Sequence, residues 1–513
     1  MEPLVRNRQQ AVEVVETYSP AEQQFNRRRK TLGLVLAPVL FCIVLAVPAE
    51  TLSPPAHRLA AIMVLVVALW VTEALPLAVT ALLVPLLAIV LRVAPAQKAL
   101  ASFSDPSIFL FIGSFILAES MYVHRLDRRI AFTALSSRRI GHSAGRLLVV
   151  FGGVSVLLSM WISNTATAAM MFPIGTAITL HLSTQAVGSK PQFRRFAATM
   201  MLVSAFGASI GGMATPIGTP PNLIGVGMLR DLAGCQITFF RWMVLGVPLS
   251  VGLFAVMALG FWLVGARGLQ LPDGTIDLVR RELVRLGRIS PGERNVIIAF
   301  SVTVLLWTLP GILAVLGQRQ SWFASGYESS MPEAAAALTG ATLLFILPVD
   351  WRQRRFTMTW DQAVRIEWGT ILLFGGGLAL GSLAFSTGLA DALGRFVSGW
   401  VSSRTPFAYT ALFTCMAAGL SELTSNTASA NMIVPIAIAV SQAAGVSPLQ
   451  PALGATLGAS VCFMLPISTP PNAIAYSSGR VPIGTMVKYG VGLSVVSCAA
   501  IIVLVTLLGP ILF

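Results

Sequence analysis

Long apolar stretches recur along this 513-residue chain and restrict what it can fold into. Each is about 17–25 residues long, the length that an α-helix needs to cross roughly 30 Å of hydrocarbon. Hydrophobic residues make up 55% of the chain and charged residues only 11%, too few to cover a soluble protein of this size. We therefore predict an all-α polytopic membrane protein with about eleven transmembrane helices, starting near Leu32, Leu59, Ala78, Ile108, Ala197, Met243, Val296, Ala335, Gly369, Ala452 and Val491.

Two further apolar stretches, residues 147–183 and 406–442, are long but broken in the middle. We interpret each as a re-entrant hairpin, the first entering from the cytoplasm and the second from outside. With a cytoplasmic N-terminus, this threading places 27 of the 35 Lys and Arg residues in cytoplasmic segments, as the positive-inside rule requires. The C-terminus is then external. The net charge of +14 is thus explained by topology, and we expect no nucleic-acid partner.

The longest polar stretch after the N-terminal tail divides the chain into two similar halves. We expect a cytoplasmic tail over 1–30, a first half with spans 1–6 over 31–265, a cytoplasmic linker over 266–295 and a second half with spans 7–11 over 296–513. Without the first span, five spans remain in each half. An odd number inverts the second copy, which predicts the inverted-topology repeat that is common among secondary transporters.

One pair of motifs occurs once in each half. Ser-Asn-Thr lies in each broken hairpin, at 163–165 and 425–427, and Thr-Pro-Pro-Asn follows at 219–222 and 469–472. Proline lacks a backbone donor and clashes with the preceding turn, so each Pro-Pro pair predicts a broken helix. At membrane depth such backbone is tolerated where it lines a cavity, and there its carbonyls can bind a cation and a helix N-terminus an anion. Two copies of the pair disfavour a mere helix-packing role for Ser-Asn-Thr.

The motif regions carry no charge. No Asp, Glu, Lys or Arg occurs in 147–189, 196–229 or 423–479, and the motifs contain no Cys or His. Neutral Ser and Asn oxygens suit a hard cation such as sodium, whereas zinc or copper is not expected. A bound anion would meet no fixed cation, so we expect co-bound cations to neutralise it and to couple the two obligatorily. Glu422, directly before the second hairpin motif, is a candidate for tuning a cation site.

After about residue 30 the sequence resembles the divalent anion–sodium symporter family. The resemblance rests on both Ser-Asn-Thr motifs and on the segments 218–222, 468–472 and 368–377. It implies that the first hairpin and first unwound loop bind one sodium ion, that the second hairpin and loop bind another, and that the substrate carboxylates lie between the hairpin tips. It also implies a homodimer in which a transport domain of each protomer slides like an elevator against a scaffold domain.

The resemblance assigns residues to these sites position by position. The first sodium site resembles the set Ser159, Ser163, Asn164 and Gly218, and the second the set Ser421, Ser425, Asn426 and Ser468. The substrate is expected to contact Asn164, Thr165, Thr219, Asn426, Thr427 and Thr469, in loops shaped by Pro220 and Pro470. Some members carry threonine at Ser421, which keeps the hydroxyl. Some carry alanine at Ser468, from which we expect only the carbonyl to contribute.

The implied function is sodium-coupled symport of C4 dicarboxylates such as succinate, malate and fumarate across a plasma or inner membrane, with at least two sodium ions. Two alternatives within transport are a di- or tricarboxylate exchanger and a citrate or sulfate transporter of the same fold. The four residues Ser159, Asn164, Ser421 and Asn426 disfavour an exchanger without sodium coupling. An intramembrane enzyme would need a nucleophile with a base or a metal cluster, which the motif regions lack. A channel is disfavoured by the paired sites.

Overall fold

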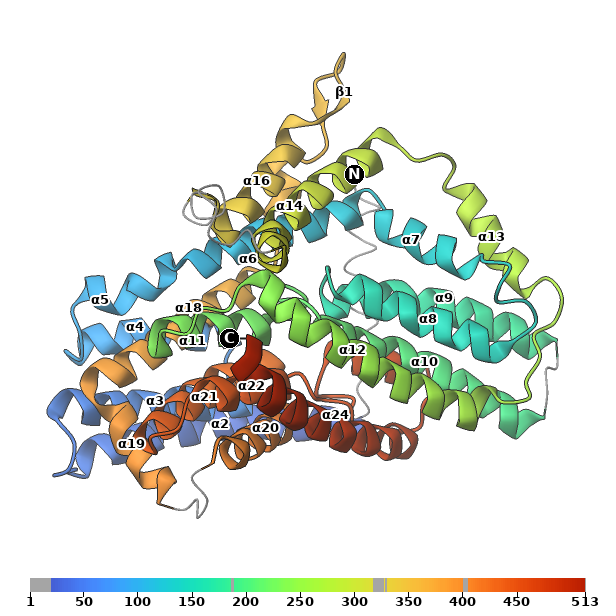
Figure 1. The fold of residues 1–513 in the computed structure, drawn as a ribbon. Coiled ribbons are helices and arrows are strands. Elements are labelled where there is room, and N and C mark those ends of the chain that lie inside the picture. The colour runs from blue at the N-terminus through green and yellow to red at the C-terminus, as the bar shows by residue number, and fades with distance from the viewer. Residues whose placement is uncertain (1–19, 186–188, 317–326, 328–329, 400–404, 513) are drawn as a thin grey trace.

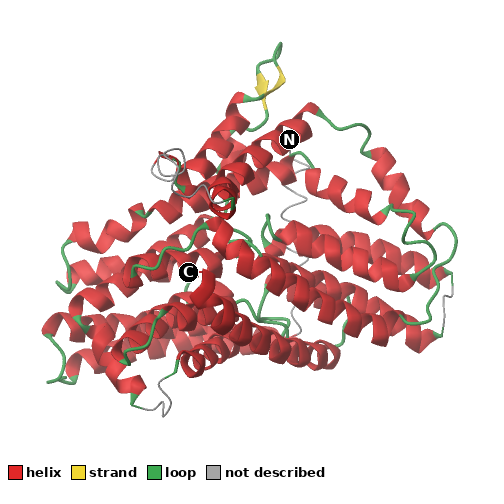
Figure 2. Ribbon diagram, viewed as in Figure 1, coloured by secondary structure: helices red, strands yellow, loops and turns green. Residues whose placement is uncertain are grey.

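The computed structural model describes residues 20–185, 189–316, 327, 330–399 and 405–512. Within these ranges the chain is mostly helical, with one short β-hairpin (Figure 2). The predicted all-α class is therefore confirmed. The start of the predicted N-terminal tail, residues 1–19, lies outside the described part, and the first described helix begins at Pro20, within that predicted tail.

The helices of the first half often begin at a Ser, Thr or Asp cap followed closely by proline, as at Ser53 and Asp105. The cap oxygen accepts a backbone N–H, and proline fits the first turn because no partner is needed there. The elements are α2 (Pro20–Ala46), α3 (Pro54–Thr72), α4 (Leu77–Val90), α5 (Ala96–Leu100), η2 (Ala101–Ser104), α6 (Pro106–Val123), α7 (Leu126–Leu135), α8 (Ala144–Ser159), α9 (Asn164–Thr184), α10 (Lys190–Gly212), α11 (Pro220–Ala233), α12 (Phe239–Phe261) and the π-helical turn η3 (Trp262–Ala266).

A polar segment with the short helix α13 (Thr275–Arg285) precedes the second half. The elements of the second half are α14 (Pro291–Val315), α16 (Glu333–Ile346), β1 (Pro348–Asp350), β2 (Arg355–Phe356), α17 (Trp360–Ala363), α18 (Trp368–Thr387), α19 (Leu389–Ser398), α20 (Pro406–Ser421), α21 (Asn426–Ala443), α22 (Leu449–Gly458), α23 (Pro470–Ser477) and α24 (Ile483–Leu512). The antiparallel hairpin β1–β2, which the sequence patterns do not predict, extends away from the helices (Figure 1).

Eight described helices are long and apolar enough to cross a membrane, and four shorter ones are also apolar. Each of the predicted span starts falls on a helix. The span predicted near Ala452 corresponds to α22, which has only 10 residues before its helix is interrupted. The multi-pass architecture is thus confirmed, and the number and direction of the crossings stay predictions.

The two halves contain the same succession of a broken hairpin, a broken helix and a final helix. These elements are α8 to α12 in the first half and α20 to α24 in the second (Figure 1). They interlock, because α23 packs against α9 and α10 while α11 packs against α21 and α22. A Cβ at Gly225 of α11 would lie 2.0 Å from the Thr456 hydroxyl of α22, so this crossing needs glycine.

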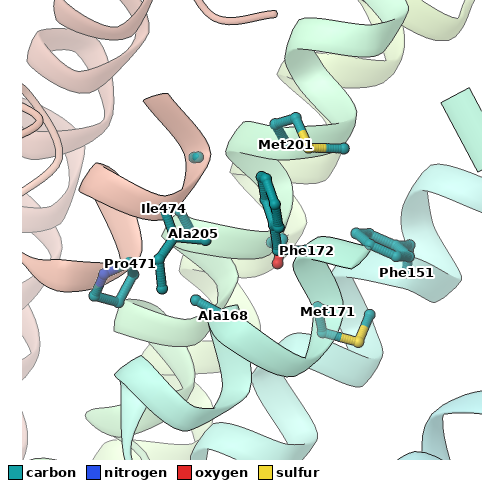
Figure 3. Close-up of a pocket in the computed structure, with 10 residues that line it drawn as sticks. Phe151, Ala168, Met171, Phe172, Met201, Ala205, Pro471 and Ile474 are labelled. Atoms are coloured by element: carbon teal, nitrogen blue, oxygen red, sulfur yellow. The ribbon is translucent and has the colours of Figure 1, made fainter. Parts of the chain in front are cut away.

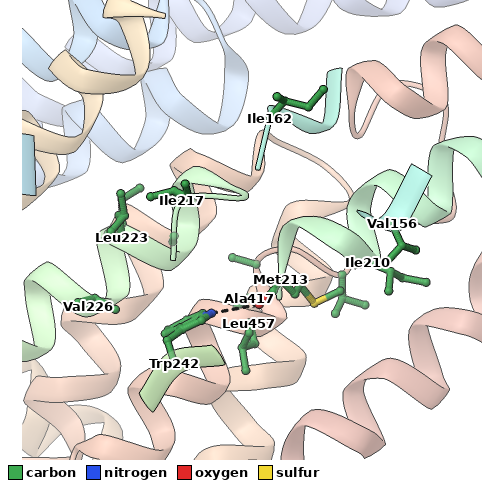
Figure 4. Packing of buried hydrophobic residues seen from close by; sticks show 14 of the residues in the cluster. Val156, Ile162, Ile210, Met213, Ile217, Leu223, Val226, Trp242, Ala417 and Leu457 are labelled. Carbon is green, nitrogen blue, oxygen red and sulfur yellow. Dashed lines mark hydrogen bonds between the residues drawn. The ribbon is translucent and has the colours of Figure 1, made fainter. Parts of the chain in front are cut away.

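The segment between α10 and α11 packs against α12. The buried Trp242 indole donates a hydrogen bond of 3.1 Å to the Met213 carbonyl, within a cluster of apolar side chains from several helices (Figure 4). One turn further along α12, Gly246 touches the same backbone: a Cβ there would lie 2.7 Å from the Met213 oxygen and 2.8 Å from the Ala214 oxygen. Close contact with α12 therefore supports the non-helical segment.

We predict that Gly246→Ala destabilises the protein by about 1–3 kcal/mol, because the added methyl group must displace rigid backbone. Gly252→Ala is the matched control on the same helix, since nothing lies within 4 Å of its Cβ position. It should keep or slightly raise stability through helix propensity. Thermal unfolding of the purified variants, with size-exclusion chromatography as the readout, measures the melting temperature of each variant. Equal melting temperatures for the two variants would contradict the assigned contact.

Candidate functional site

The first broken helix has a segment, residues 213–219, that a single asparagine holds in place. Helix α10 ends at Gly212 and α11 starts at Pro220, after Thr219 in an extended conformation with φ −146° and ψ 143°. The buried Asn222 amide donates hydrogen bonds of 2.8 Å to the Gly212 carbonyl and 2.7 Å to the Thr215 carbonyl. Two backbone oxygens released by the break are therefore satisfied without water, as membrane depth requires.

The second broken helix repeats this arrangement at the same sequence offsets. Here α22 ends at Gly458, and α23 starts at Pro470 after Thr469, with φ −147° and ψ 150°. The buried Asn472 amide donates to the carbonyls of Cys462 and Leu465, both at 3.1 Å, the residues ten and seven positions upstream. The two asparagines were quoted in the motifs but not predicted as site residues. Their recurrence directly after Pro-Pro in both halves is the signal that identifies them.

Both hairpin tips also have the same geometry. Ser163 and Ser425 are the N-caps of α9 and α21, and their hydroxyls accept the backbone N–H three residues ahead at 3.3 Å and 3.1 Å. The next residue in each half, an asparagine, is the first residue of the helix. The Ser159 hydroxyl donates to the Asn164 side-chain oxygen at 2.7 Å, and the equivalent Ser421–Asn426 bond is 2.8 Å long.

The structure brings the predicted members of the first cation set together. A Cβ built on Gly212 would lie 2.4 Å from the Asn164 side-chain oxygen, and one on Gly218 would lie 2.6 Å from the Gly212 carbonyl. The Thr215 hydroxyl also donates to the Met160 carbonyl at 2.5 Å, which joins the unwound loop to the hairpin. Hairpin tip and loop thus meet with neutral oxygens only, a donor type that suits a hard monovalent cation.

Different hydrogen bonds hold the residues of the second cation set. The Ser421 hydroxyl also lies 2.6 Å from the Ala459 carbonyl at the start of the second unwound segment, so its single hydrogen is shared between this oxygen and that of Asn426. The Ser468 hydroxyl donates to the Leu465 carbonyl at 2.7 Å and lies 3.2 Å from the Asn472 amide, which donates to it. The expectation that Ser468 contributes only its carbonyl to the cation site stays a prediction, and its hydroxyl forms a hydrogen bond within the loop.

A carboxylate reaches into the second loop and has no counterpart in the first. Glu422 is only 6% exposed, and its oxygens accept the backbone N–H groups of Phe463 at 2.8 Å, Met464 at 3.1 Å and Leu465 at 3.3 Å. Met160 occupies the equivalent position after Ser159. The second site therefore has a buried carboxyl group beside it and the first has none, consistent with the tuning role that the sequence suggests for Glu422.

The predicted substrate residues lie at the N-termini of four helices. Thr165 and Thr427 are the second residues of α9 and α21 and are partly exposed, whereas Thr219 and Thr469 are buried before α11 and α23. Pro220 is half-buried and Pro470 exposed. Among the described residues no hydrogen bond joins the first hairpin tip to the second.

The halves meet beside these positions. A small apolar cavity lies between α9, α10 and α23, and Pro471 lies close to Ala168 and Phe172 across it (Figure 3). The second helix break thus packs directly on the first hairpin. In the described part of the chain no group of three or more His, Cys, Asp and Glu side chains could hold a metal ion, so the oxygen sets are the candidate cation sites.

We predict that Asn222→Leu increases amide hydrogen exchange in residues 213–219 and lowers stability by about 1–3 kcal/mol, because two buried carbonyls lose their donor. Asn295→Leu is the matched control: that buried asparagine also donates twice, to the Pro348 carbonyl and the Thr357 hydroxyl, far from the loop. It should destabilise the protein and leave exchange in the loop unchanged. Unchanged loop exchange in Asn222→Leu would disprove the proposed clamp.

Several known proteins are similar to this chain in sequence or in fold. The sodium-dependent dicarboxylate transporter SdcS of Staphylococcus saprophyticus is 33% identical over 484 residues, 93% of this chain and 91% of its own, and SdcS of Staphylococcus aureus is 33% identical over 485 residues, 94% and 91%. The fold is similar to the Alcanivorax borkumensis YdaH transporter, with TM-score 0.53, 13% identity and coverage of 90% of this chain and 99% of that one. It is also similar to Neisseria gonorrhoeae MtrF, with TM-score 0.52, 14% identity and coverage of 89% and 95%.

The family comparison covers nearly the whole chain. Residues 28–513 match the family described as the sodium:sulfate symporter transmembrane region. The resemblance to divalent anion–sodium symporters is thereby confirmed, as is the prediction of a transporter rather than an enzyme. The chain belongs to the sodium:sulfate symporter family of membrane transporters.

Proposed function

We propose that this protein is a sodium-coupled symporter for C4 dicarboxylates such as succinate, malate and fumarate. The observation that carries the proposal is the duplicated set of neutral oxygens in which a hairpin serine–asparagine pair lies against an asparagine-clamped loop. The similarity to proteins named sodium-dependent dicarboxylate transporters supports both the sodium coupling and the dicarboxylate substrate of the proposal.

In the proposed mechanism each half holds one sodium ion. The first ion is coordinated by Ser159, Ser163, Asn164 and Gly218, and the second by Ser421, Ser425, Asn426 and Ser468. The paired oxygens of Ser159 and Asn164 are 2.7 Å apart, close enough to share one cation. Oxygen ligands lie roughly 2.3–2.6 Å from Ca²⁺, an ion of similar radius to Na⁺. Sodium binding would replace the hydrogen bond between them and lock hairpin and loop together.

The anion is bound by helix N-termini and by neutral donors. Backbone N–H groups at the start of α9 and α21, together with the side chains of the four motif threonines, would receive its two carboxylates, whereas α11 and α23 begin with two prolines that have no N–H to donate. Since residues 147–189, 196–229 and 423–479 contain no Lys or Arg, the sodium ions supply the neutralising charge. Transport of the anion then requires sodium, which makes coupling obligatory.

We also propose that the protein works as a homodimer with an elevator-like movement of the domain built from α8–α12 and α20–α24. The interlocking of these helices supports their movement as one unit. The N-terminus would be cytoplasmic, the C-terminus external and the membrane the plasma or inner membrane.

The direct test is uptake of radiolabelled succinate into proteoliposomes under sodium, lithium or potassium gradients. We expect uptake with sodium and competition by malate and fumarate. Equal uptake without any cation gradient, but with internal dicarboxylate, would assign an exchanger instead. Stronger competition by citrate or sulfate would change the substrate class, which the family's description leaves open.

Asn164→Ala and Asn426→Ala should each abolish sodium-dependent succinate uptake, because each removes the side-chain oxygen shared by a hairpin and its cation. Expression and dimerisation should be unchanged. Asn295→Ala, at a buried asparagine outside the site, should retain uptake per folded protein. Normal uptake by both motif variants would overturn the site assignment.

Glu422→Gln should raise the sodium concentration for half-maximal uptake by roughly tenfold. Unit charges a few Å apart in an effective dielectric of about 20 attract by a few kcal/mol, and about 1.4 kcal/mol equals a factor of ten. Met160→Gln at the equivalent position in the first half is the matched control and should leave this concentration unchanged. If Glu422→Gln lowered uptake equally at every sodium concentration, Glu422 would be only a structural brace.

A further inference from the structure

A large cavity lies away from both cation sets, on the side of the domain where α7, α8 and α12 meet. Its volume is about 910 Å³. It is bounded by the end of α7 and the loop that follows, by the first turns of α8 and by the end of α12 with η3. Its lining includes Arg139, Arg146, Val149, Ala255, Leu259 and Trp262. This is much larger than a packing defect and is open to a long, partly apolar ligand.

The rim of the cavity carries two arginines that pair with no carboxylate in the described part of the chain. Arg139 and Arg146 are both exposed, and the Arg146 guanidinium donates to the Arg139 backbone carbonyl at 3.0 Å, which holds it over the loop. Asp273, on the segment that pairs with this loop, lies 3.5 Å from His142. The rim therefore presents two guanidinium groups that are available to an anion.

The interior and the outer wall of the cavity are apolar. Val149, Leu259 and Trp262 are 40%, 57% and 39% exposed, and each would be costly to leave in water. Trp262 begins the π-helical turn and lies on Gly145, where a Cβ would be only 2.4 Å from the indole ring. Tryptophan and arginine side by side are typical of the membrane–water boundary.

The rim is a fixed part of the fold. The loop before α8 pairs with the segment before α13: Leu271 donates to the His142 carbonyl at 2.7 Å and Ala144 donates to the Leu269 carbonyl at 3.4 Å. Arg129 of α7 also forms a two-point ion pair with Glu293, at 2.6 Å and 3.1 Å, which attaches α7 to the start of α14. The guanidinium groups are thus held at one end of a preformed apolar cavity.

From this combination we infer a binding site for an anionic phospholipid, with its phosphate between Arg139 and Arg146 and an acyl chain against Val149, Leu259 and Trp262. The apolar length of the cavity favours a lipid over a small soluble anion. The two unneutralised arginines favour an anionic headgroup over a zwitterionic one. In the predicted orientation the ligand comes from the cytoplasmic leaflet.

The location suggests what the lipid does. The cavity lies between α7, which is attached to α14, and α8, the first arm of a candidate cation hairpin. A lipid that fills it contacts both the moving domain of the proposed mechanism and the element that is tied to the rest of the protein. An effect of the lipid on this movement rests on the proposed function, whereas the binding site does not.

The test uses quenching of Trp262 by brominated lipids in the purified full-length protein. The chain has ten tryptophans, so the Trp262 signal is taken as the difference between the wild type and Trp262→Phe. We expect brominated phosphatidylglycerol to quench this signal at roughly tenfold lower mole fraction than brominated phosphatidylcholine, since each basic residue near a lipid headgroup contributes measurably. Equal quenching by the two lipids would overturn the inference.

Arg139→Gln/Arg146→Gln should remove the preference for phosphatidylglycerol. The matched control Arg128→Gln/Arg138→Gln removes two exposed charges from the same region that do not line the cavity and should retain the preference.

Ala255→Phe should weaken quenching by both lipids because it fills the cavity and leaves the charges in place. If the double variant does not fold, each single variant should lose part of the preference. Full preference without the two arginines would refute the site. Succinate uptake with and without phosphatidylglycerol is measured separately, so a failure of the proposed function leaves the binding result interpretable.

Discussion

The arrangement of the site depends on two buried amides. Asn222 and Asn472 each donate twice to carbonyls ten and seven residues upstream and thereby close an interrupted helix into a compact loop. Broken backbone inside a membrane has no water to satisfy it, so every freed carbonyl needs a protein donor or a bound cation. The amides satisfy some carbonyls of each loop and shape the rest. Without them the hairpin tips would have no ordered surface to meet.

Much of this could be predicted from sequence because the chemistry is local. The Pro-Pro pairs that begin at Pro220 and Pro470 each break a helix. Ser163 and Ser425 each cap the following helix by accepting the backbone N–H three residues ahead. Apolar length sets the spans independently of how they pack. These features therefore fall where the patterns predict them, including both breaks and all predicted span starts.

The features that could not be predicted depend on contacts between segments distant in sequence. The hydroxyl of Thr215 meets the Met160 carbonyl across 55 positions, and Glu422 reaches the 463–465 backbone across more than 40. Nothing in the local sequence shows which of several buried hydroxyl or carboxyl groups will find such a partner. Ser468 illustrates the limit: its position in the loop followed from the motif, but the bracing role of its hydroxyl follows only from where Leu465 and Asn472 lie.

The inverted repeat reproduces the backbone of the site without reproducing its electrostatics. In the first half Gly212 lies so close to Asn164 that a Cβ would come within 2.4 Å of the amide oxygen, whereas the corresponding position in the second half is Cys462. The second loop must therefore leave more room beside its asparagine. Its backbone N–H groups also donate to the Glu422 side chain of the second hairpin, while the first loop is fastened by an uncharged hydroxyl–carbonyl contact. At the proposed cation sites, an ion in the second position would lie near the Glu422 side chain and one in the first would not, so two ions bound by the same motif are expected to differ in affinity.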